Sequence, residues 1–482
     1  MLSEPFRQGA DPVCMKPYRR IWSAWLAAFL LSLLQSSAPG LSWATTYYVN
    51  PSGSDVGPGT HAQPWQTISR AADILVAGDT VLIGAGTYRE SIVPANSGAS
   101  GRYITYAAQE GATVIVDGAS INLEEYTGLV YIAYKSYIKV SGLQIRNAGP
   151  NPNNAGILVD GSHHITIQGN KTYNTVSSGI GVWSSSEITV EGNEVELACN
   201  DGQQECITVA GTSGFTVSGN HVHHNGPGSN GGEGIDAKDG SSNGRISGNH
   251  VHDLSRLGIY VDAWDKHTFG ITIDKNRVDN CRNDGITLAS EMGGLLEDVL
   301  VSNNVVSNNL LHGIAVTPNG PVAAPPMRNL TIVNNTLHHN GDGSVPSPWG
   351  GGIVVDNPNL ESLLIRNNIF SDNLFFQILL DVPVIGLQVD HNLIDGFRGY
   401  ENEILGASPV TGNPLFVDAS AGNYRLQAGS PAIDKGAAGS APADDYDMIK
   451  RPQGAGVDIG AHEYVPGRRS ALAGILFLLQ QH

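Results

Sequence analysis

The sequence predicts an all-β protein whose chain winds into a right-handed parallel β-helix, and three observations support this fold class. A short strand of the form G-I-x-V recurs along most of the chain. A second strand, alternating in polarity and ending in asparagine, follows it in repeat after repeat. Glycine is abundant, with 59 of 482 residues, whereas charged residues make up only 15%. This composition favours many short strands joined by tight turns.

The first strand begins about every 23 to 28 residues, with one longer step that contains a loop from 318 to 326. Its copies start at Gly156, Gly179, Cys206, Gly234, Gly258, Gly285, Gly313 and Gly352. The second strand ends at Asn170, Asn193, Asn220, Asn249, Asn276, Asn304, Asn335, Asn368 and Asn392. This period is typical of one coil of a parallel β-helix, and the rule for parallel crossovers makes it right-handed. We expect inward Ile and Val side chains to form the core and the asparagines to stack into an amide ladder.

Each end of a solenoid exposes strand edges and core, so both ends need a cap. Apolar residues at helical spacing from Thr67 to Val76 predict an amphipathic helix over the first coil. Residues 413–466 break the period and are rich in Gly, Ala, Asp and Pro, which predicts an irregular C-terminal cap. The expected organisation is therefore a β-helix with its N-terminal cap over 45–412, the C-terminal cap, and a tail over 467–482. That tail is either disordered or a sorting signal.

Residues 1–44 have the features of a secretory signal peptide. Basic residues up to Arg20 precede a short apolar run, and Ala44 ends a cleavage site. The run is short for a membrane span, so no transmembrane segment is expected after cleavage, and the protein is expected to be extracellular or periplasmic. The net charge of −18 argues against a nucleic-acid partner. It is compatible with a polysaccharide substrate, including an acidic one if a cation mediates the contact. The oligomeric state stays open.

The cysteines allow two interpretations once Cys14 is assigned to the signal peptide. Cys199 and Cys206 could form a disulfide in an oxidising compartment, which would leave Cys281 unpaired. Alternatively, all three are small buried hydrophobic residues.

Charged side chains gather on the outward positions of three consecutive G-I-x-V strands. Because Ile and Val face inward, the residue between them, the one after Val and the one before Gly face outward. In these coils the outward positions hold Glu205, Glu233, Asp236, Lys238, Tyr260 and Asp262. Arg256 lies just before the third strand, and Trp264, Lys266 and His267 follow it. This concentration of functional side chains predicts a site on one face of the solenoid.

The acids in these columns predict a cation site. Equivalent residues on neighbouring strands lie about 4.8 Å apart, so Lys238 is expected to touch Asp262, and Glu205 to lie beside Glu233. Like carboxylates this close need a proton or a cation between them. Glu205, Glu233, Asp236 and Asp262 are therefore candidate ligands of Ca²⁺, which binds six to eight oxygens. The alternative is a surface ion pair between Lys238 and Asp262, with the acids solvated.

Histidines follow the ladder asparagine in several coils. They are His221, His223 and His224, then His250 and His252, and later His338 and His339. Stacked imidazoles can bind a transition metal. Because the positions directly follow the same corner in each coil, we favour a repeated turn preference as the explanation.

Several segments resemble known carbohydrate-active β-helix proteins. YYVNPSGSDVGPGTHAQPWQTISRAADILVAGDTVLIGAGTYRE at 47–90 is similar to the N-terminal cap of secreted bacterial β-helix proteins, including polysaccharide lyase family nine pectate lyases. NPLFVDASAGNYRLQAGSPAIDKG and GVDIGAHEY resemble their C-terminal segment. EGIDAKDG at 233–240 resembles a segment that carries an acidic calcium ligand in family nine. It also resembles the E-x-x-x-x-K spacing of the chondroitinase B and alginate lyase family, which implies that Glu233 binds calcium and Lys238 is the base.

The chain departs from family nine at two places. The acidic Asp-Asp-Gly-x-Asp cluster of that family corresponds to residues 256–262 here, of which only Asp262 keeps its acid. The base lysine of that family falls at about Thr287, which cannot act as a base. The substrate of family nine therefore does not follow for this chain.

Together these features predict a secreted carbohydrate-active enzyme, a Ca²⁺-assisted lyase that cleaves a uronate-containing polysaccharide by β-elimination. Lys238, Asp262 and Asp236 are the catalytic candidates. The substrate-binding candidates are Arg256, Tyr260, Trp264, Lys266 and His267. One alternative is an inverting glycoside hydrolase that uses Asp236 and Asp262, expected ~8 Å apart. The others are a C5-epimerase and a non-catalytic surface or adhesion β-helix.

Overall fold

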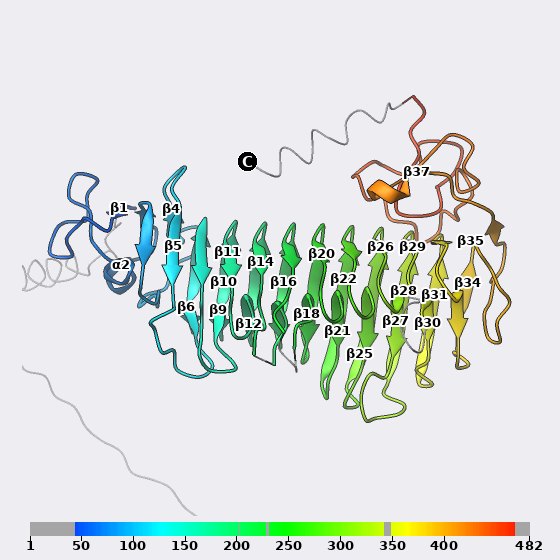
Figure 1. The fold of residues 1–482 in the computed structure, drawn as a ribbon, viewed down its shortest axis with the longest axis horizontal. Coiled ribbons are helices and arrows are strands. Elements are labelled where there is room, and N and C mark those ends of the chain that lie inside the picture. Colours follow the sequence, from blue (N-terminus) through cyan, green and yellow to red (C-terminus); the bar gives the residue numbers. More distant parts are fainter. Residues whose placement is uncertain (1–43, 202, 228–230, 342–348, 468–482) are drawn as a thin grey trace, which may run out of the picture. The chain divides into compact units, whose positions relative to one another are not determined.

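The computed structural model describes residues 44–201, 203–227, 231–341 and 349–467, and in these residues the chain forms stacked coils of parallel strands (Figure 1). The described residues contain three parallel sheets of 13, 13 and 10 strands, to which successive coils contribute one strand each. The predicted parallel β-helix is confirmed. The predicted signal peptide, apart from Ala44, and nearly all of the predicted tail lie outside the described residues.

The first sheet contains the alternating strands that end at the ladder asparagines. In order they are β1 (Thr46–Val49), β2 (Thr80–Ile83), β4 (Ile104–Ala108), β7 (Ser136–Ser141), β10 (His163–Gln168), β13 (Ser186–Glu191), β16 (Ser213–Ser218), β19 (Ser242–Ser247), β22 (His267–Asp274), β25 (Leu295–Ser302), β28 (Met327–Val333), β31 (Leu360–Arg366) and β34 (Gln388–Asp390).

The second sheet follows the ladder asparagines and is made of shorter strands. They are β3 (Gly86–Tyr88), β5 (Val114–Asp117), β8 (Leu143–Arg146), β11 (Lys171–Tyr173), β14 (Glu194–Glu196), β17 (His221–His223), β20 (His250–His252), β23 (Arg277–Asp279), β26 (Val305–Ser307), β29 (Thr336–His338), β32 (Ile369–Ser371), β35 (Leu393–Asp395) and β36 (Val410–Thr411).

The third sheet contains the G-I-x-V strands. They are β6 (Gly128–Ala133), β9 (Ala155–Asp160), β12 (Ile180–Trp183), β15 (Ile207–Ala210), β18 (Ile235–Lys238), β21 (Ile259–Asp262), β24 (Ile286–Ala289), β27 (His312–Thr317), β30 (Gly351–Val355) and β33 (Phe376–Leu380). Ile207 pairs in register with Ile235, and Ile235 with Ile259, and all three are fully buried. Parallel pairing in constant register thus stacks the inward side chains into one continuous core.

The predicted amide ladder is confirmed. Asn249 shows its geometry: Nδ2 donates to Asn276 Oδ1 at 2.9 Å and to the carbonyl of Val217 at 2.9 Å. Asn249 Oδ1 accepts from the backbone N–H of Asn220 at 2.9 Å and from its Nδ2 at 3.0 Å. Each buried amide therefore has partners in both neighbouring coils, which meets the cost of burying a polar side chain. A second, shorter ladder of Asn309, Asn340 and Asn373 accompanies it.

The predicted N-terminal helix is also confirmed, as α2 (Ile68–Ile74). Thr67 caps it by accepting from the backbone N–H of Arg70, and Glu90 accepts from the N–H groups of Ile68 and Ser69. These acceptors satisfy donors that the first turn of a helix leaves free. Ile68 is fully buried against the core, so the helix covers apolar side chains at this end.

The C-terminal segment differs from a simple plug over the last coil. It contains an antiparallel pair, β37 (Phe416–Asp418) and β38 (Asn423–Leu426), joined by a short 3₁₀ helix η2 (Ala419–Ala421). It packs against the side of the solenoid near β26, β29 and β35 (Figure 1), where Arg451 donates to Asn303 at 3.2 Å. Loops over 381–387 and 396–409 instead place apolar side chains such as Val382 against the core at the open end. Among the described residues, no helix is long and apolar enough to cross a membrane.

Candidate active site

Five acidic side chains come together on the outer face of the third sheet. We call Glu205, Glu233, Asp236, Asp262 and Glu291 the acid cluster. Asp236 lies on β18 and Asp262 on β21, Glu205 and Glu233 lie just before β15 and β18, and Glu291 follows β24. Glu205 and Glu233 are 5% and 6% exposed, and Asp236 and Asp262 are 1% and 2% exposed. The alternative of solvated surface acids is therefore wrong. Buried carboxylates need cations, protons or hydrogen-bond donors.

Lys238 is the central cation of this site. Its Nζ donates to Glu205 Oε1 at 2.7 Å and to Gln204 Oε1 at 3.3 Å, and lies 4.0 Å from Asp236 Oδ2. The expected contact between Lys238 and Asp262 is wrong, because within the described ranges Asp262 is not among its ion-pair partners within 4.0 Å.

The small side chain of Ala210 explains the direction that Lys238 takes. Ala210 occupies the register position of Lys238 on the preceding strand β15, and Trp183 occupies it one strand earlier on β12. The long lysine side chain can therefore extend over Ala210, and its Nζ lies 5.9 Å from the centroid of the Trp183 ring. This places the ammonium beside Glu205 and over an aromatic face, where both contacts favour its charge.

The second cation of the site, Arg256, pairs with Glu233. Arg256 Nε lies 2.8 Å from Glu233 Oε1, and its side chain is 40% exposed. Burial and the neighbouring charge of Glu205 nevertheless raise the pKa of Glu233 to about 7, because they outweigh the opposing effect of Arg256. The charge of Arg256 thus does not offset the effect of burial and of Glu205 on Glu233.

The two buried aspartates, Asp236 and Asp262, have strongly raised pKa values. Burial raises the pKa of Asp236 well above its ordinary value, and the charges of Glu205 and Asp262 raise it further. Burial also raises the pKa of Asp262 well above its ordinary value, and Glu291 adds to this. Asp236 Oδ1 and Asp262 Oδ1 are buried and accept no hydrogen bond from any described residue. Protonation or a bound cation would relieve this excess of negative charge.

The same acids act on Lys238 in the opposite direction. Burial by itself lowers the pKa of Lys238, but Glu205 and Asp236 outweigh burial and hold the pKa above its ordinary value. The lysine therefore keeps its proton at neutral pH for as long as these acids are ionised and no other cation is present.

Tyr260 connects the acid cluster to the turns that follow it. It stands at the register position of Asp236 and is 4% exposed. Its hydroxyl donates to Glu291 Oε1 and accepts from Asn319 Nδ2 at 2.7 Å. Burial raises its pKa well above the ordinary value, and the charges of Asp262 and Glu291 add to this, so the hydroxyl keeps its proton.

The other substrate-binding candidates separate into two groups. Trp264, in the turn after β21, is 43% exposed and offers a free aromatic surface near this end of the sheet. Lys266 is exposed in the same turn, and His267 begins β22 of the first sheet. His267 Nε2 lies 2.9 Å from Glu297 Oε2 and so is engaged by the first sheet rather than by the acid cluster.

Sequence reasoning missed three residues of this site. Trp183 occupies the outward column of Lys238, so a reading of that column two coils further back would have found it. Gln204 directly precedes Glu205, outside the columns considered. Asn319 lies in the loop after β27 and reaches Tyr260 across 59 residues of sequence, for which no pattern gives a signal.

The histidines on β17 and β20 are strand residues rather than turn residues. His221 and His223 lie on β17, and His250 and His252 lie on β20. The interpretation as a turn preference is therefore wrong for these four, which stand on the outer face of the second sheet.

The cysteines are buried free thiols in the structure. Cys199, Cys206 and Cys281 are each at most 1% exposed and none forms a disulfide. Cys199 donates through Sγ to the carbonyl of Gln204 at 2.8 Å. This agrees with the interpretation of all three as small residues of the core.

Comparison with known proteins identifies the family. Residues 47–314 match the family described as Pel9A-like, right handed beta helix region, and residues 271–394 match one described as right handed beta helix region. The uncharacterized protein YwoF of Bacillus subtilis (strain 168) is 31% identical over 437 residues, which cover 80% of this chain and 91% of YwoF. Pectate lyase PEL9 of Emericella nidulans is 38% identical over 80 residues, 16% of this chain and 20% of that protein.

A solved structure agrees with this assignment. The crystal structure of pectate lyase Pel9A matches with a TM-score of 0.54 and 17% identity, over 88% of this chain and 97% of Pel9A. At that identity the likeness shows the fold alone. With more than half of the chain matching the family description and a relative matched over nearly its whole length, the chain belongs to the Pel9A-like right-handed β-helix family.

Proposed function

We propose that this protein is a Ca²⁺-assisted polysaccharide lyase that is exported and cleaves a uronate-containing glycan by β-elimination. The observation that carries this proposal is the acid cluster around Lys238, four of whose five members are buried. A lysine held among excess carboxylates becomes a base once another cation offsets their charge. Membership of the Pel9A-like family and the partial likeness to pectate lyase PEL9 support the same class of substrate.

The acid cluster fits a hard divalent cation. It offers carboxylate oxygens, which are the ligands that Ca²⁺ prefers, and Asp236 Oδ1 and Asp262 Oδ1 lack hydrogen-bond partners. Among the described residues, no three members of the acid cluster have ligand atoms that all lie within 4.8 Å of one another. Asp236, Asp262 and Glu233, with Glu205 beside them, would therefore hold Ca²⁺ together with water and a substrate carboxylate, as open calcium sites do. Bound Ca²⁺ supplies positive charge that neutralises the uronate carboxylate and acidifies the proton at C5.

Lys238 is the proposed base. When the charge of Glu205 and Asp236 is offset, the pKa of Lys238 falls and its neutral amine can remove the C5 proton. The electron pair left on C5 forms the double bond between C4 and C5, and the bond from C4 to the glycosidic oxygen breaks. Tyr260 keeps its proton and can donate it to the leaving oxygen. Arg256, whose side chain is 40% exposed, would bind the substrate carboxylate.

The remaining candidates would bind the glycan rather than take part in the elimination. Trp264 offers an exposed indole ring on which a sugar ring can stack. Lys266, in the same turn, and His267 would contact acidic groups further along the chain of an anionic polysaccharide.

Formation of an unsaturated product tests the proposal. The full-length protein is incubated with pectate, alginate or a glycosaminoglycan, in calcium or in EDTA, and the ultraviolet absorbance of the new double bond is followed. We expect activity on at least one of these glycans in calcium and its loss in EDTA. Lys238→Ala should lower the rate by about 10²–10⁴-fold, the contribution typical of a general base. Lys139→Ala, on β7 of the first sheet, is the matched control and should leave the rate unchanged. Absence of unsaturated product from all three glycans would overturn the proposal.

The two aspartates favour one second candidate, an inverting glycoside hydrolase. Asp236 pairs in register with Tyr260, so Asp236 and Asp262 are diagonal neighbours on adjacent strands. Such positions lie ~8 Å apart, within the ~6.5–9.5 Å of an inverting carboxylate pair. Their raised pKa values suit a general acid. Release of reducing sugar without unsaturated product would favour this function. The same activity should be lost in Asp236→Asn and in Asp262→Asn.

A further inference from the structure

Four imidazoles form a two-by-two array on the outer face of the second sheet. His221 and His223 alternate along β17, and His250 and His252 stand beside them on β20, in register as His221 with His250 and His223 with His252. The rings of His221 and His250 are stacked at 5.4 Å between centroids, and those of His223 and His252 at 5.2 Å. The acid cluster lies on the third sheet, so this array is a separate feature of the molecule.

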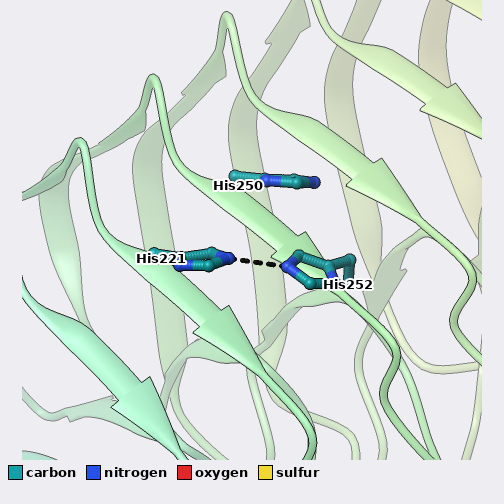
Figure 2. A group of neighbouring side chains, drawn as sticks. All are labelled: His221, His250 and His252. Atoms are coloured by element: carbon teal, nitrogen blue, oxygen red, sulfur yellow. Dashed lines mark hydrogen bonds between the residues drawn. The ribbon is translucent and has the colours of Figure 1, made fainter. Parts of the chain in front are cut away.

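Ring nitrogens from three of these histidines converge. His221 Nε2 lies 2.7 Å from His252 Nε2, and Figure 2 shows the two rings pointing toward each other with His250 beside them. One nitrogen from each of His221, His250 and His252 lies within 4.8 Å of the other two. Two Nε2 atoms at 2.7 Å either share one proton or direct their lone pairs at a common ion. A single shared proton needs only two nitrogens, so the third converging nitrogen favours a common ion.

Carboxylates behind two of the rings orient them as metal ligands are oriented. Asp253 Oδ2 lies 2.6 Å from His252 Nδ1, so the neutral ring donates from Nδ1 and keeps its lone pair on Nε2, the atom that faces His221. Asp279 Oδ1 lies 2.9 Å from His250 Nε2, which fixes that ring and leaves the lone pair on Nδ1. Carboxylate–histidine pairs of this kind accompany histidine-ligated metals and strengthen the ligand.

The array also contains a buried ring nitrogen beside a carboxylate. His223 is 8% exposed, and its Nε2 lies 3.5 Å from Glu194 Oε1. Glu194 and His223 form a second converging group with His221. His221 is thus shared by both groups.

We propose that His221, His250 and His252 form a binding site for a divalent transition metal ion, with Zn²⁺ as its representative and water in the fourth position. Imidazole nitrogens prefer such ions to Ca²⁺. Zinc–nitrogen bonds of about 2.0–2.1 Å place two tetrahedral ligands roughly 3.3 Å apart, so the two Nε2 atoms would separate by roughly 0.6 Å on binding. Side-chain rotation on the partly exposed second sheet provides this movement.

The site would join two coils. His221 comes from one coil and His250 and His252 from the next, so a bound ion would cross-link β17 to β20. A metal ion that binds the folded chain but not the unfolded chain stabilises the fold by mass action. This stabilisation grows with the ratio of the free metal concentration to the dissociation constant. The site therefore has a readout, thermal stability, that does not depend on any enzymatic activity.

Titration of the tag-free, EDTA-treated full-length protein with ZnCl₂ tests the proposal. Isothermal calorimetry should give one tight site per chain, and Zn²⁺ should raise the thermal midpoint. His221→Ala and His252→Ala should each weaken binding at least about 100-fold, and Asp253→Asn should weaken it about 10–100-fold through its effect on His252. His339→Ala is the matched control, because His339 also follows a ladder corner and lies beside an acid, Asp372.

Two outcomes would overturn the site: wild-type protein that binds Zn²⁺ no more tightly than a His221→Ala/His252→Ala double variant, or an equal loss of binding in His339→Ala. Equal thermal midpoints of all variants in EDTA would show that they fold, and a variant that fails this check is replaced by the corresponding His→Gln. Addition of Co²⁺ in place of Zn²⁺ gives a second readout, since histidine ligation in a tetrahedral site produces visible absorption that His252→Ala should abolish.

Discussion

In the absence of a bound cation, the Glu233→Gln variant is expected to gain stability relative to the wild-type protein as the pH rises. Burial and Glu205 raise the pKa of Glu233 to about 7, whereas its ordinary value is 4.5. Because the folded-state pKa is the higher one, protonation of Glu233 stabilises the fold fully below about pH 4.5, and this contribution is lost as the pH rises through about 7. Glutamine is neutral throughout and has no such contribution to lose.

The size of the effect follows from these two pKa values. Between about pH 5 and about pH 8, linkage gives a loss of about 2–3 kcal/mol for one group with this shift. Glu233 is 6% exposed, so solvent screening reduces the figure little. With an unfolding entropy of about 2 cal/mol/K per residue, a chain of this length converts that free energy into about 3 °C in Tm.

The assay is thermal unfolding of both proteins in EDTA at the two pH values. Subtracting the variant from the wild type removes the contribution of His221, whose lowered pKa changes stability in the opposite direction over part of this range. Glu110→Gln, at an exposed turn, is the control and should differ from wild type equally at both pH values. A stability difference between wild type and Glu233→Gln that stays constant with pH, or that grows in favour of the wild type, would refute the reasoning.

Three further predictions concern stability. Lys238→Met leaves Glu205 buried without its cation and should cost about 3–5 kcal/mol in urea denaturation, most of which a second change, Glu205→Gln, should recover; costs that simply add would contradict this. Asn249→Ala removes hydrogen bonds to both neighbouring coils and should lower the unfolding free energy by about 3 kcal/mol or more; a change within about 0.5 kcal/mol, the range of surface substitutions, would show that the ladder contributes little. Gly244→Ala places a Cβ 2.0 Å from the ring of Phe215 and should cost about 1–3 kcal/mol by thermal unfolding, unless Phe215→Leu in the same chain provides the space; an equal cost with and without the smaller neighbour would be inconsistent with that contact.

The fold could be predicted from sequence because its determinants are local and repeated. Each coil carries its own inward Ile and Val and its own corner asparagine, and parallel pairing repeats the register from coil to coil. The outward columns likewise identified the strands that carry the acid cluster.

The contacts within the site could not be predicted in the same way. Lys238 pairs with Glu205 rather than with its neighbour Asp262, because the small side chain of Ala210 leaves room in the opposite direction. Burial of the acids depends on surrounding turns, whose lengths vary between coils. The contact of Asn319 with Tyr260 comes from such a turn. Alternation along a strand predicts which face a residue occupies, but not how far its side chain reaches or what covers it.

The amide ladder has a consequence for how this architecture can change over evolution. Each ladder asparagine from Asn193 to Asn368 makes the same bonds to the coil before and the coil after it, as Asn249 does with Asn220 and Asn276. A duplicated coil could therefore be inserted almost anywhere and find complementary partners on both sides. Insertion between β15 and β21 is the exception, because it would separate Glu205 from Asp262 by a further strand spacing. The scaffold can lengthen in whole coils, while the three coils of the acid cluster must be inherited as one block.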